Sequence, residues 1–414
     1  MPARSCRKSS AKPCRERSRN IRLLWFLPAI PAAVSRMKTP PSLLPDPATL
    51  ASRLAAALYG DGAAGRLVTI LERKLPRMMS TFPNEIVTCR LPDGRTQRVF
   101  AKYEAGHSHN SFGHRGNVRY EADVYCRVLK ALPGFRPRFL GMHGDALTGD
   151  TSLFLEYAYR SVRVSDISVK QTIRQPRAIT QAARWLAQFH VWHESRAGDP
   201  ALAFLKRYDA DYYRGWAKRT FEFAHPLRQD LPWLAELRAR GDSWFAPLLV
   251  TAPTVIHGEF YAKTVLLRGE NLFMVDWEST AIAAGEIDLA ALTEGKGWPA
   301  DIVRRCEREY CRVRWPKGTP AQFQQTLDAA RIYLHFRWLG ERPDWTLREK
   351  SFWRYGALRA AAERLGLLSG HRNARGGAVG GRGPGLIRSA AQRSGRGGRL
   401  CARDNNRRKS PRPR

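Results

Sequence analysis

The sequence has few acidic residues and few cysteines. Its 414 residues include 37 Asp and Glu against 70 Lys and Arg, which gives a formal net charge of +33. The seven cysteines form no CxxC pair and no Cys/His cluster at zinc-ligand spacing, so we expect neither a zinc-bound nor a disulfide-stapled domain. This cysteine usage favours a reducing, intracellular compartment, and we expect a cytoplasmic protein.

The sequence also lacks an apolar run long enough to cross a bilayer. Residues 23–34, LLWFLPAIPAAV, follow a basic stretch, but this run of 12 residues is too short for a membrane span. A basic segment followed by such a run resembles a secretory signal. We instead interpret residues 1–36 as a disordered or dispensable extension, with Met37 as the working start, and we expect no membrane partner.

Much of the positive charge lies at the two ends. Residues 1–36 hold nine basic and one acidic residue, residues 371–414 hold 13 basic and one acidic residue, and the region between them carries +13. Residues 371–414 are rich in Arg and Gly and have almost no large apolar residues, so they are expected to be disordered. Such a tail is either a solvated extension or a nucleic-acid binder, and we expect nucleic-acid binding only through the ends.

Between the ends, a strand-rich part is followed by a mostly helical part, with no internal repeat. We expect an α+β fold with a small antiparallel-sheet N-lobe over residues 37–156 and a helical C-lobe over residues 157–370. The expected strands span 85–91, 98–103 and 152–156; the expected helices span 49–59, 118–132, 179–193, 202–223, 323–339 and 347–367. Cys306 and Cys311 are interpreted as ordinary helix residues.

The segment VIHGEFYAKTVLLRGENLFMVDWE, residues 255–278, interrupts the helical part. A short apolar strand leads into His257, and Gly258 allows a sharp turn directly after it. Glu259 is then expected at a strand end, in a loop, where a carboxylate can project into a cleft.

Two short apolar runs around RGEN predict a hairpin in the second half of this segment. Such a hairpin returns Asp276 beside the loop that carries Glu259 and Thr264. Two carboxylates and one hydroxyl then surround a single small volume. Phosphoryl transfer calls for such a set, because one carboxylate accepts the proton of the attacking hydroxyl while another holds Mg²⁺ at the nucleotide phosphates.

The segment resembles the catalytic segment of the aminoglycoside phosphotransferase and choline kinase family, whose pattern is HGDxxxxN followed by a hairpin and an Asp. The likeness extends over roughly residues 50–368. Its further motifs are VFAKY with Lys102, YEADVYCRVL with Glu121, FLEY with Glu156 and Tyr157, AARWLAQFH, and GEIDLAAL with Asp288.

The resemblance implies a protein-kinase-like, bilobal fold that transfers the γ-phosphoryl group of ATP or GTP, with Mg²⁺, to a hydroxyl of a small molecule. It implies that Lys102 contacts the α- and β-phosphates while Glu121 orients it. Glu156 and Tyr157 would contact the nucleotide at the hinge between the lobes.

The resemblance also implies roles in the loop after the strand. Glu259 would stand at the catalytic base, and His257 would brace the loop, with Asp288 as the candidate partner, rather than carry a proton. Asp276 would be the principal Mg²⁺ ligand, with Thr264 as a second ligand.

The sequence departs from the family pattern in three places. Glu259 replaces the usual Asp, which lengthens the side chain by one methylene. Thr264 replaces the metal-binding Asn, although a Thr oxygen can ligate Mg²⁺ as it does in P-loops. There is no glycine-rich loop, only a turn over residues 79–83 that could cover the phosphates.

Three alternatives stay open at this level. The chain could be a pseudokinase that binds nucleotide without turnover because of Thr264, or it could bind nucleic acid through its basic tails. The acceptor could bind at RYDADYYRGW, residues 207–216, although Asp209, Asp211, Tyr212 and Tyr213 suit capping and packing equally well. The positive charge of the region argues mildly against a polycationic acceptor.

Overall fold

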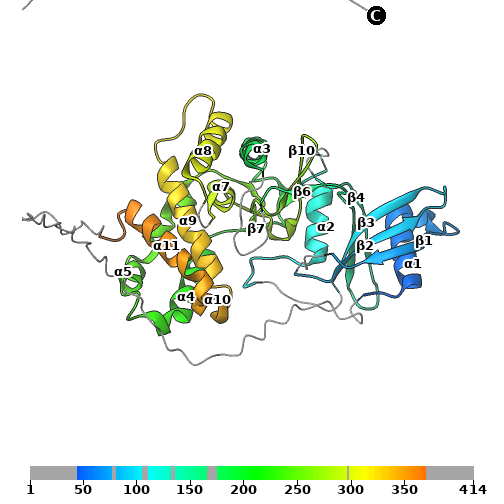
Figure 1. Cartoon of the computed structure of the whole chain (residues 1–414), viewed down its shortest axis with the longest axis horizontal. Coiled ribbons are helices and arrows are strands. Elements are labelled where there is room, and N and C mark those ends of the chain that lie inside the picture. The colour runs from blue at the N-terminus through cyan, green and yellow to red at the C-terminus, as the bar shows by residue number, and fades with distance from the viewer. Residues whose placement is uncertain are drawn as a thin grey trace, which may run out of the picture. The chain divides into compact units, whose positions relative to one another are not determined.

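The computed structural model describes residues 44–76, 81–104, 111–130, 132, 136–165, 175–295 and 298–369 (Figure 1). The expectations for residues 1–36 and 371–414, and for the first residues of the turn at 79–83, lie outside these ranges. The described elements form a strand-rich part followed by a mostly helical part. The two-lobe α+β arrangement expected from the sequence is therefore confirmed.

The N-lobe is built on one antiparallel sheet of five strands in the order β1-β2-β3-β5-β4. The sheet ends at Glu156, from which the chain continues into the helical part. The elements of the N-lobe are α1 (Pro47–Tyr59), β1 (Thr69–Lys74), β2 (Asn84–Arg90), β3 (Thr96–Tyr103), α2 (Val118–Arg127), β4 (Phe139–Gly144) and β5 (Thr151–Glu156).

Alternation along β3 and β5 gives the sheet two different faces. Val99, Ala101 and Tyr103 of β3 join Phe154 of β5 in a small core with α1. Leu153 and Leu155 of β5 join the core that includes α2 and the C-lobe. Because Lys102 stands between Ala101 and Tyr103, its side chain lies on the α2 face of the sheet.

The C-lobe is mostly helical, with two small three-stranded sheets, β10-β9-β6 and β7-β11-β8. Its strands are β6 (Val162–Arg163), β7 (Lys206–Arg207), β8 (Pro253–Ile256), β9 (Val265–Arg268), β10 (Asn271–Met274) and β11 (Ala281–Ala284). Its helices are α3 (Pro176–Glu194), α4 (Ala210–Phe223), α5 (Trp233–Ala239), α6 (Ala246–Val250), α7 (Glu286–Thr293), α8 (Ala300–Arg314), α9 (Phe323–Leu339), α10 (Pro343–Leu347) and α11 (Phe352–Arg364). Short 3₁₀ helices include η7 (Trp277–Ser279), which follows β10.

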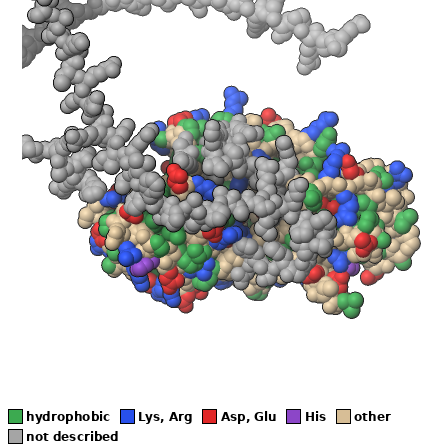
Figure 2. Space-filling model, turned by 60° about the horizontal axis from the view of Figure 1, so that its bottom comes forward, with side chains coloured by type: hydrophobic (Ala, Val, Ile, Leu, Met, Phe, Trp, Pro, Cys, Tyr) green, Lys and Arg blue, Asp and Glu red, His purple; other side chains and the backbone are tan. Residues whose placement is uncertain are grey.

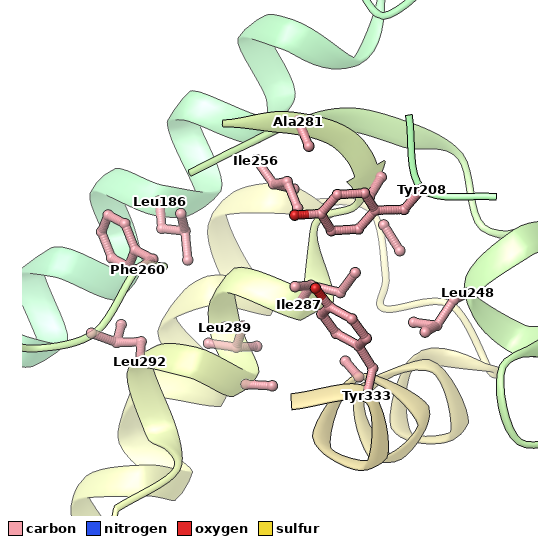
Figure 3. Packing of buried hydrophobic residues seen from close by; sticks show 14 of the residues in the cluster. Leu186, Tyr208, Leu248, Ile256, Phe260, Ala281, Ile287, Leu289, Leu292 and Tyr333 are labelled. Carbon is pink, nitrogen blue, oxygen red and sulfur yellow. The ribbon is translucent and has the colours of Figure 1, made fainter. Parts of the chain in front are cut away.

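One large hydrophobic core fills the C-lobe and continues to α2 of the N-lobe. Figure 3 shows part of it, where Phe260 lies beside Leu186 of α3. The rings of Tyr208 and Tyr333 lie 5.8 Å apart in the same core. Because this core includes Phe260 of the loop after β8, packing fixes the backbone of that loop where it faces the core.

Five of the six expected helices have different bounds in the structure, and three of them differ by more than three residues at one end. The helix expected over 118–132 ends at Arg127, where the N–H groups of Val128 and Leu129 both donate to the carbonyl of Val124 and close the last turn. The helix expected over 202–223 begins only at Ala210, because the preceding residues form β7 beside β11. The helix expected over 347–367 is shorter, because a 3₁₀ turn over Glu349–Ser351 precedes it and α11 covers only Phe352–Arg364.

No helix in the described part of the chain is both long enough and apolar enough to cross a membrane. On the face in Figure 2, basic and acidic side chains are interspersed over the described surface. The described part of that face therefore presents charges of both signs rather than a continuous basic patch.

The loop after β8 approaches η7 very closely at Gly258. Gly258 has φ +80, and a Cβ atom there would lie 2.1 Å from the carbonyl oxygen of Ser279. No side-chain rotation can relieve this clash, because the contacting oxygen belongs to the backbone. Gly258 is therefore required both for its left-handed backbone and for the contact between the two segments.

We predict that Gly258→Ala lowers the free energy of unfolding by about 3 kcal/mol or more, because strain and a backbone clash add. Gly94→Ala is the matched control, since Gly94 has φ +81 but nothing lies within 4 Å of its Cβ position. The control should lose only about 1–2 kcal/mol in urea unfolding. Equal losses in the two variants would contradict the close approach.

Candidate functional site

Lys102 of β3 is buried among three carboxylates. Its Nζ lies 2.6 Å from Oε2 of Glu121, 2.6 Å from Oε2 of Glu278 and 3.4 Å from Oδ1 of Asp276, and the side chain is only 2% exposed. Glu121 comes from the first turn of α2, whereas Asp276 and Glu278 come from the turn after β10. Four charged groups from three elements therefore meet at one point between the lobes.

The carboxylates keep Lys102 charged despite its burial. Burial alone would lower the pKa of Lys102, but the attraction of Glu121, Glu278 and Asp276 outweighs it and holds the pKa well above its usual range. Burial has the opposite effect on Glu278, whose pKa rises to about 7 in spite of Lys102. With three carboxylates and one ammonium group, the cluster has a formal charge of −2.

The three carboxylates differ in the partner of the oxygen that does not contact Lys102. Oε1 of Glu121 accepts from the backbone N–H of Trp277, and Oε1 of Glu278 accepts from the Thr81 hydroxyl. The Asp276 side chain is 38% exposed, and among the described residues only Lys102 pairs with it. Glu121, Asp276 and Glu278 each offer a carboxylate oxygen within 4.8 Å of the others, a set that can hold a metal ion. Asp276 is thus the member of the cluster that faces outward.

The turn that presents Asp276 is held by its neighbour. Asp276 has a left-handed backbone, with φ 75 and ψ 59, which is uncommon outside Gly and Asn and is typical of functional turns. Trp277 is fully buried, its indole N–H donates to the carbonyl of Met274, and its ring lies 4.5 Å from that of His257. Burial of Trp277 therefore fixes the direction in which Asp276 points.

The loop after β8 is braced by Asp288 of α7. Oδ2 and Oδ1 of Asp288 accept from the backbone N–H groups of His257 and Gly258, at 2.6 and 2.9 Å. Burial raises the pKa of Asp288 to about 6, an effect that His257 and these hydrogen bonds oppose. The loop is therefore anchored through its backbone at the turn.

The His257 ring is fully buried and makes two contacts. Its Nε2 lies 3.1 Å from the carbonyl oxygen of Val275, and its Nδ1 lies 3.3 Å from the backbone N–H of Glu259. Burial lowers the pKa of His257, which favours a neutral ring that donates from Nε2 and accepts at Nδ1. The ring thus links the Glu259 loop to the residue before Asp276.

Glu259 lies in a second charged cluster. Its Oε1 lies 2.9 Å from Nη2 of Arg115 and 3.3 Å from Nε2 of His114, and it also accepts from Arg337 of α9. Burial alone would raise the pKa of Glu259, but Arg115 and Arg337 outweigh it and hold the pKa well below its usual range. All of these contacts go to Oε1, and none of the other described residues bonds to Oε2.

Arg115 connects the two clusters. Besides Glu259, it reaches Glu278 at 3.3 Å through Nε and Glu341 at 3.0 Å through Nη1. Arg115 belongs to the segment before α2, and Gly116 in the same segment donates its N–H to the carbonyl of Glu278. The segment 111–117 therefore joins the Lys102 cluster to the Glu259 cluster.

The Thr264 hydroxyl is buried in its own loop. Its oxygen lies 2.8 Å from the carbonyl of Tyr261 and 3.2 Å from that of Glu259, so it donates its one hydrogen to loop carbonyls. Its backbone carbonyl accepts from the N–H of Val275, which places it beside the residue before Asp276. Only the lone pairs of the Thr264 oxygen remain for a further partner.

Glu156 and Tyr157 stand where the chain leaves the sheet. Glu156 pairs with Val99 in the sheet register and lies 3.7 Å from Arg268, and Tyr157 donates its N–H to the carbonyl of Arg98. The two residues therefore lie at the connection between the lobes, and among the described residues they share no hydrogen bond or ion pair with the two charged clusters.

Five residues of the site were missed in the sequence: Glu278, Arg115, Arg337, His114 and Glu341. Glu278 carried a signal, because it is the last residue of the DWE motif, but it was not assigned a role. Arg115 and Arg337 carried none, because one precedes a helix and the other lies in a long amphipathic helix, where an arginine usually faces solvent. Only the folded chain brings both arginines to Glu259.

The segment RYDADYYRGW is explained by capping and packing. Asp209 caps α4 by accepting from the N–H of Tyr212, and Asp211 pairs with Arg214 at the surface. Tyr213 is fully buried, and the Tyr212 hydroxyl lies 2.9 Å from Nδ1 of His114. This segment therefore contributes no free acidic pocket.

No family model matches the sequence, and no curated protein matches it either. Solved structures that resemble the fold include the choline kinase LicA from Streptococcus pneumoniae, at 14% identity over 71% of this chain and 94% of that chain, with a TM-score of 0.47.

Two further solved structures resemble the chain. The macrolide 2'-phosphotransferase MphH from Brachybacterium faecium is 15% identical over 77% of this chain and 97% of that chain, with a TM-score of 0.46. An aminoglycoside phosphotransferase from Alicyclobacillus acidocaldarius is 15% identical over 72% of this chain and 90% of that chain, with a TM-score of 0.46. At these values the resemblance assigns neither an activity nor a substrate to this chain.

We predict that Lys102→Met costs about 3–5 kcal/mol of unfolding free energy, because it leaves buried carboxylates without their cation. Lys74→Met is the control, since Lys74 pairs with Glu72 at 2.6 Å but is 63% exposed and should lose less than about 1 kcal/mol. Urea unfolding of both variants measures the difference. A Lys102→Met variant as stable as the control would show that the cluster contributes little to the fold.

Proposed function

We propose that the protein is a phosphotransferase that moves the γ-phosphoryl group of ATP or GTP to a hydroxyl group of a small molecule. The observation that carries this proposal is the Lys102 cluster, in which a buried ammonium is oriented by Glu121 while Asp276 keeps an outward-facing oxygen. A charged lysine next to an open carboxylate suits a nucleotide's phosphates together with their metal ion. Glu156 and Tyr157 would contact the nucleotide base at the hinge.

The residues of the Lys102 cluster fit a magnesium ion. Mg²⁺ prefers oxygen ligands, and the cluster offers carboxylates with a formal charge of −2. Asp276 would be the principal ligand, and Thr264 would add its hydroxyl oxygen from the neighbouring loop. Bound Mg²⁺ supplies charge neutralisation at the phosphates, and the cluster's own role is to hold Lys102 and the ligand oxygens in place.

Glu259 would receive the acceptor hydroxyl. Its Oε1 is held by Arg115 and Arg337, which leaves Oε2 to accept a hydrogen bond from the hydroxyl and orient its oxygen. In the transfer, the acceptor oxygen forms a bond to the γ-phosphorus while the bond to the bridging oxygen breaks. The nucleoside diphosphate leaves, and the hydroxyl proton passes to Glu259.

The lowered pKa of Glu259 limits its strength as a base. A loose phosphoryl-transfer transition state places little demand on base strength and more on position, so a well-oriented carboxylate is sufficient. His257 would act as a positioning residue, because its ring holds the Glu259 backbone against the segment that leads to Asp276.

A second candidate is nucleotide binding without turnover. It is favoured by the bridge from Glu259 through Arg115 to Glu278, which occupies the space between the two clusters. This candidate shares the nucleotide site and differs only in product formation, so turnover separates the two.

We predict that Asp276→Asn lowers metal-dependent release of nucleoside diphosphate by at least about 100-fold, because the amide removes the charge that holds Mg²⁺. The fold should persist, since the side chain is 38% exposed. The assay follows ADP or GDP release with a panel of hydroxyl compounds.

Asp344→Asn is the control, because Asp344 pairs with Arg342 on the surface and its side chain is 61% exposed. It should release nucleoside diphosphate at the wild-type rate. If wild-type protein binds nucleotide but releases no product with any acceptor, the binding-only function is correct. Full activity of Asp276→Asn would rule out the metal role of Asp276.

A further inference from the structure

A pocket with aromatic walls opens beside the loop that carries Glu259. Tyr261, Lys263, Trp298 and Trp338 line it together with Glu294 and Arg354. The indole N–H of Trp338 donates to the Tyr261 hydroxyl at 2.7 Å, and the Trp338 ring stacks on Trp345 at 5.5 Å. The wall formed by Tyr261 and Trp338 is therefore rigid before any ligand arrives.

Two cations of the chain lie on this aromatic wall. Nζ of Lys263 lies 5.1 Å from the Tyr261 ring and 5.7 Å from the Trp338 ring. The guanidinium of Arg354, a residue that is 9% exposed, lies 4.4 Å from the Trp338 ring. Among the described residues, neither cation has a hydrogen bond or an ion pair, so both keep N–H groups for a ligand.

The one acidic residue among the lining side chains is already compensated. Glu294 lies 3.3 Å from Nε of Arg331, which is outside the pocket. Burial raises the pKa of Glu294, and Arg331 opposes that rise. The lining of the pocket therefore has an excess of positive charge, and its aromatic faces are covered by the chain's own cations.

The pocket lies next to the proposed site of transfer. Lys263 is four residues after Glu259 and directly precedes Thr264. Tyr261 of the pocket wall donates its backbone N–H to the carbonyl of Glu259 at 2.7 Å, and Arg337, which pairs with Glu259, directly precedes Trp338. A compound in the pocket can thus present a hydroxyl to Glu259.

We propose that this pocket binds an anionic group of the acceptor and that the acceptor is a hydroxyl compound with a carboxylate or phosphate group. Lys263 and Arg354 bind the anionic group, and the rings of Tyr261 and Trp338 hold the two cations in place. A cationic amine is disfavoured by charge, because two cations and only one carboxylate line the pocket. This inference rests on the proposed function for the use of the pocket, but the charge preference stands on the pocket alone.

Calorimetric titration of the full chain with four probes tests the inference: glucuronate, glucose 6-phosphate, glucose and glucosamine. They share a sugar ring and differ in charge. At least one of the two acids should bind about tenfold or more tightly than glucose, with glucosamine weakest. The two acids separate a carboxylate preference from a phosphate preference.

Variants of Lys263 make the test specific to the pocket. Lys263→Met should remove the preference for the acid, and Lys263→Arg, which keeps the charge, should retain it. Lys218→Met is the matched control, because Lys218 is 75% exposed and its loss should leave the preference unchanged. These variants should unfold at the wild-type temperature.

Three results would overturn the inference: no acid binds at millimolar concentration, glucose or glucosamine binds as tightly as both acids, or Lys263→Met keeps the preference. Failure of the proposed function gives a different pattern. In that case an acid binds and depends on Lys263, but no phosphorylated product forms from it with Mg²⁺ and ATP or GTP.

Discussion

The burial of one ammonium group, that of Lys102, is the constraint on which the site depends. A buried cation is costly unless it is paired, and Lys102 is paired with Glu121 of α2 and Glu278 of the turn after β10. One partner belongs to the N-lobe and the other to the C-lobe. The contacts that keep Lys102 charged therefore also hold the two lobes together. Asp276, the partly exposed member of the cluster, remains accessible to a ligand.

Charge is divided between two neighbouring clusters. The Lys102 cluster is acidic overall, whereas Glu259 and Glu341 are balanced by Arg115 and Arg337. The first cluster keeps an excess of negative charge, as a metal site requires. The second is already neutral, which makes Glu259 a fixed hydrogen-bond acceptor and a weak base. Under the proposed function, binding of phosphates and orientation of the acceptor would depend on different sets of charges.

The parts of the site that could be predicted from the sequence are those formed by residues close together in the chain. The hairpin of β9 and β10, the loop with Glu259 and the strand with Lys102 all follow from short patterns, and the structure brings Lys102, Glu121 and Asp276 together. Arg115 and Arg337 could not be predicted, because their contacts with Glu259 join residues far apart in the chain. The predicted start of α4 was wrong, because β7 pairs with β11. This tertiary contact overrides the helical periodicity of the sequence.

Thermal unfolding of the protein with ATP or GTP, each with and without Mg²⁺, tests the central claim most directly, since it requires no acceptor. Ligand that binds the folded state raises its stability by mass action. A nucleotide site at the Lys102 cluster predicts a rise in unfolding temperature with nucleotide that is larger when Mg²⁺ is present. No rise with millimolar nucleotide and Mg²⁺ would contradict it and leave the cluster as a structural ion network.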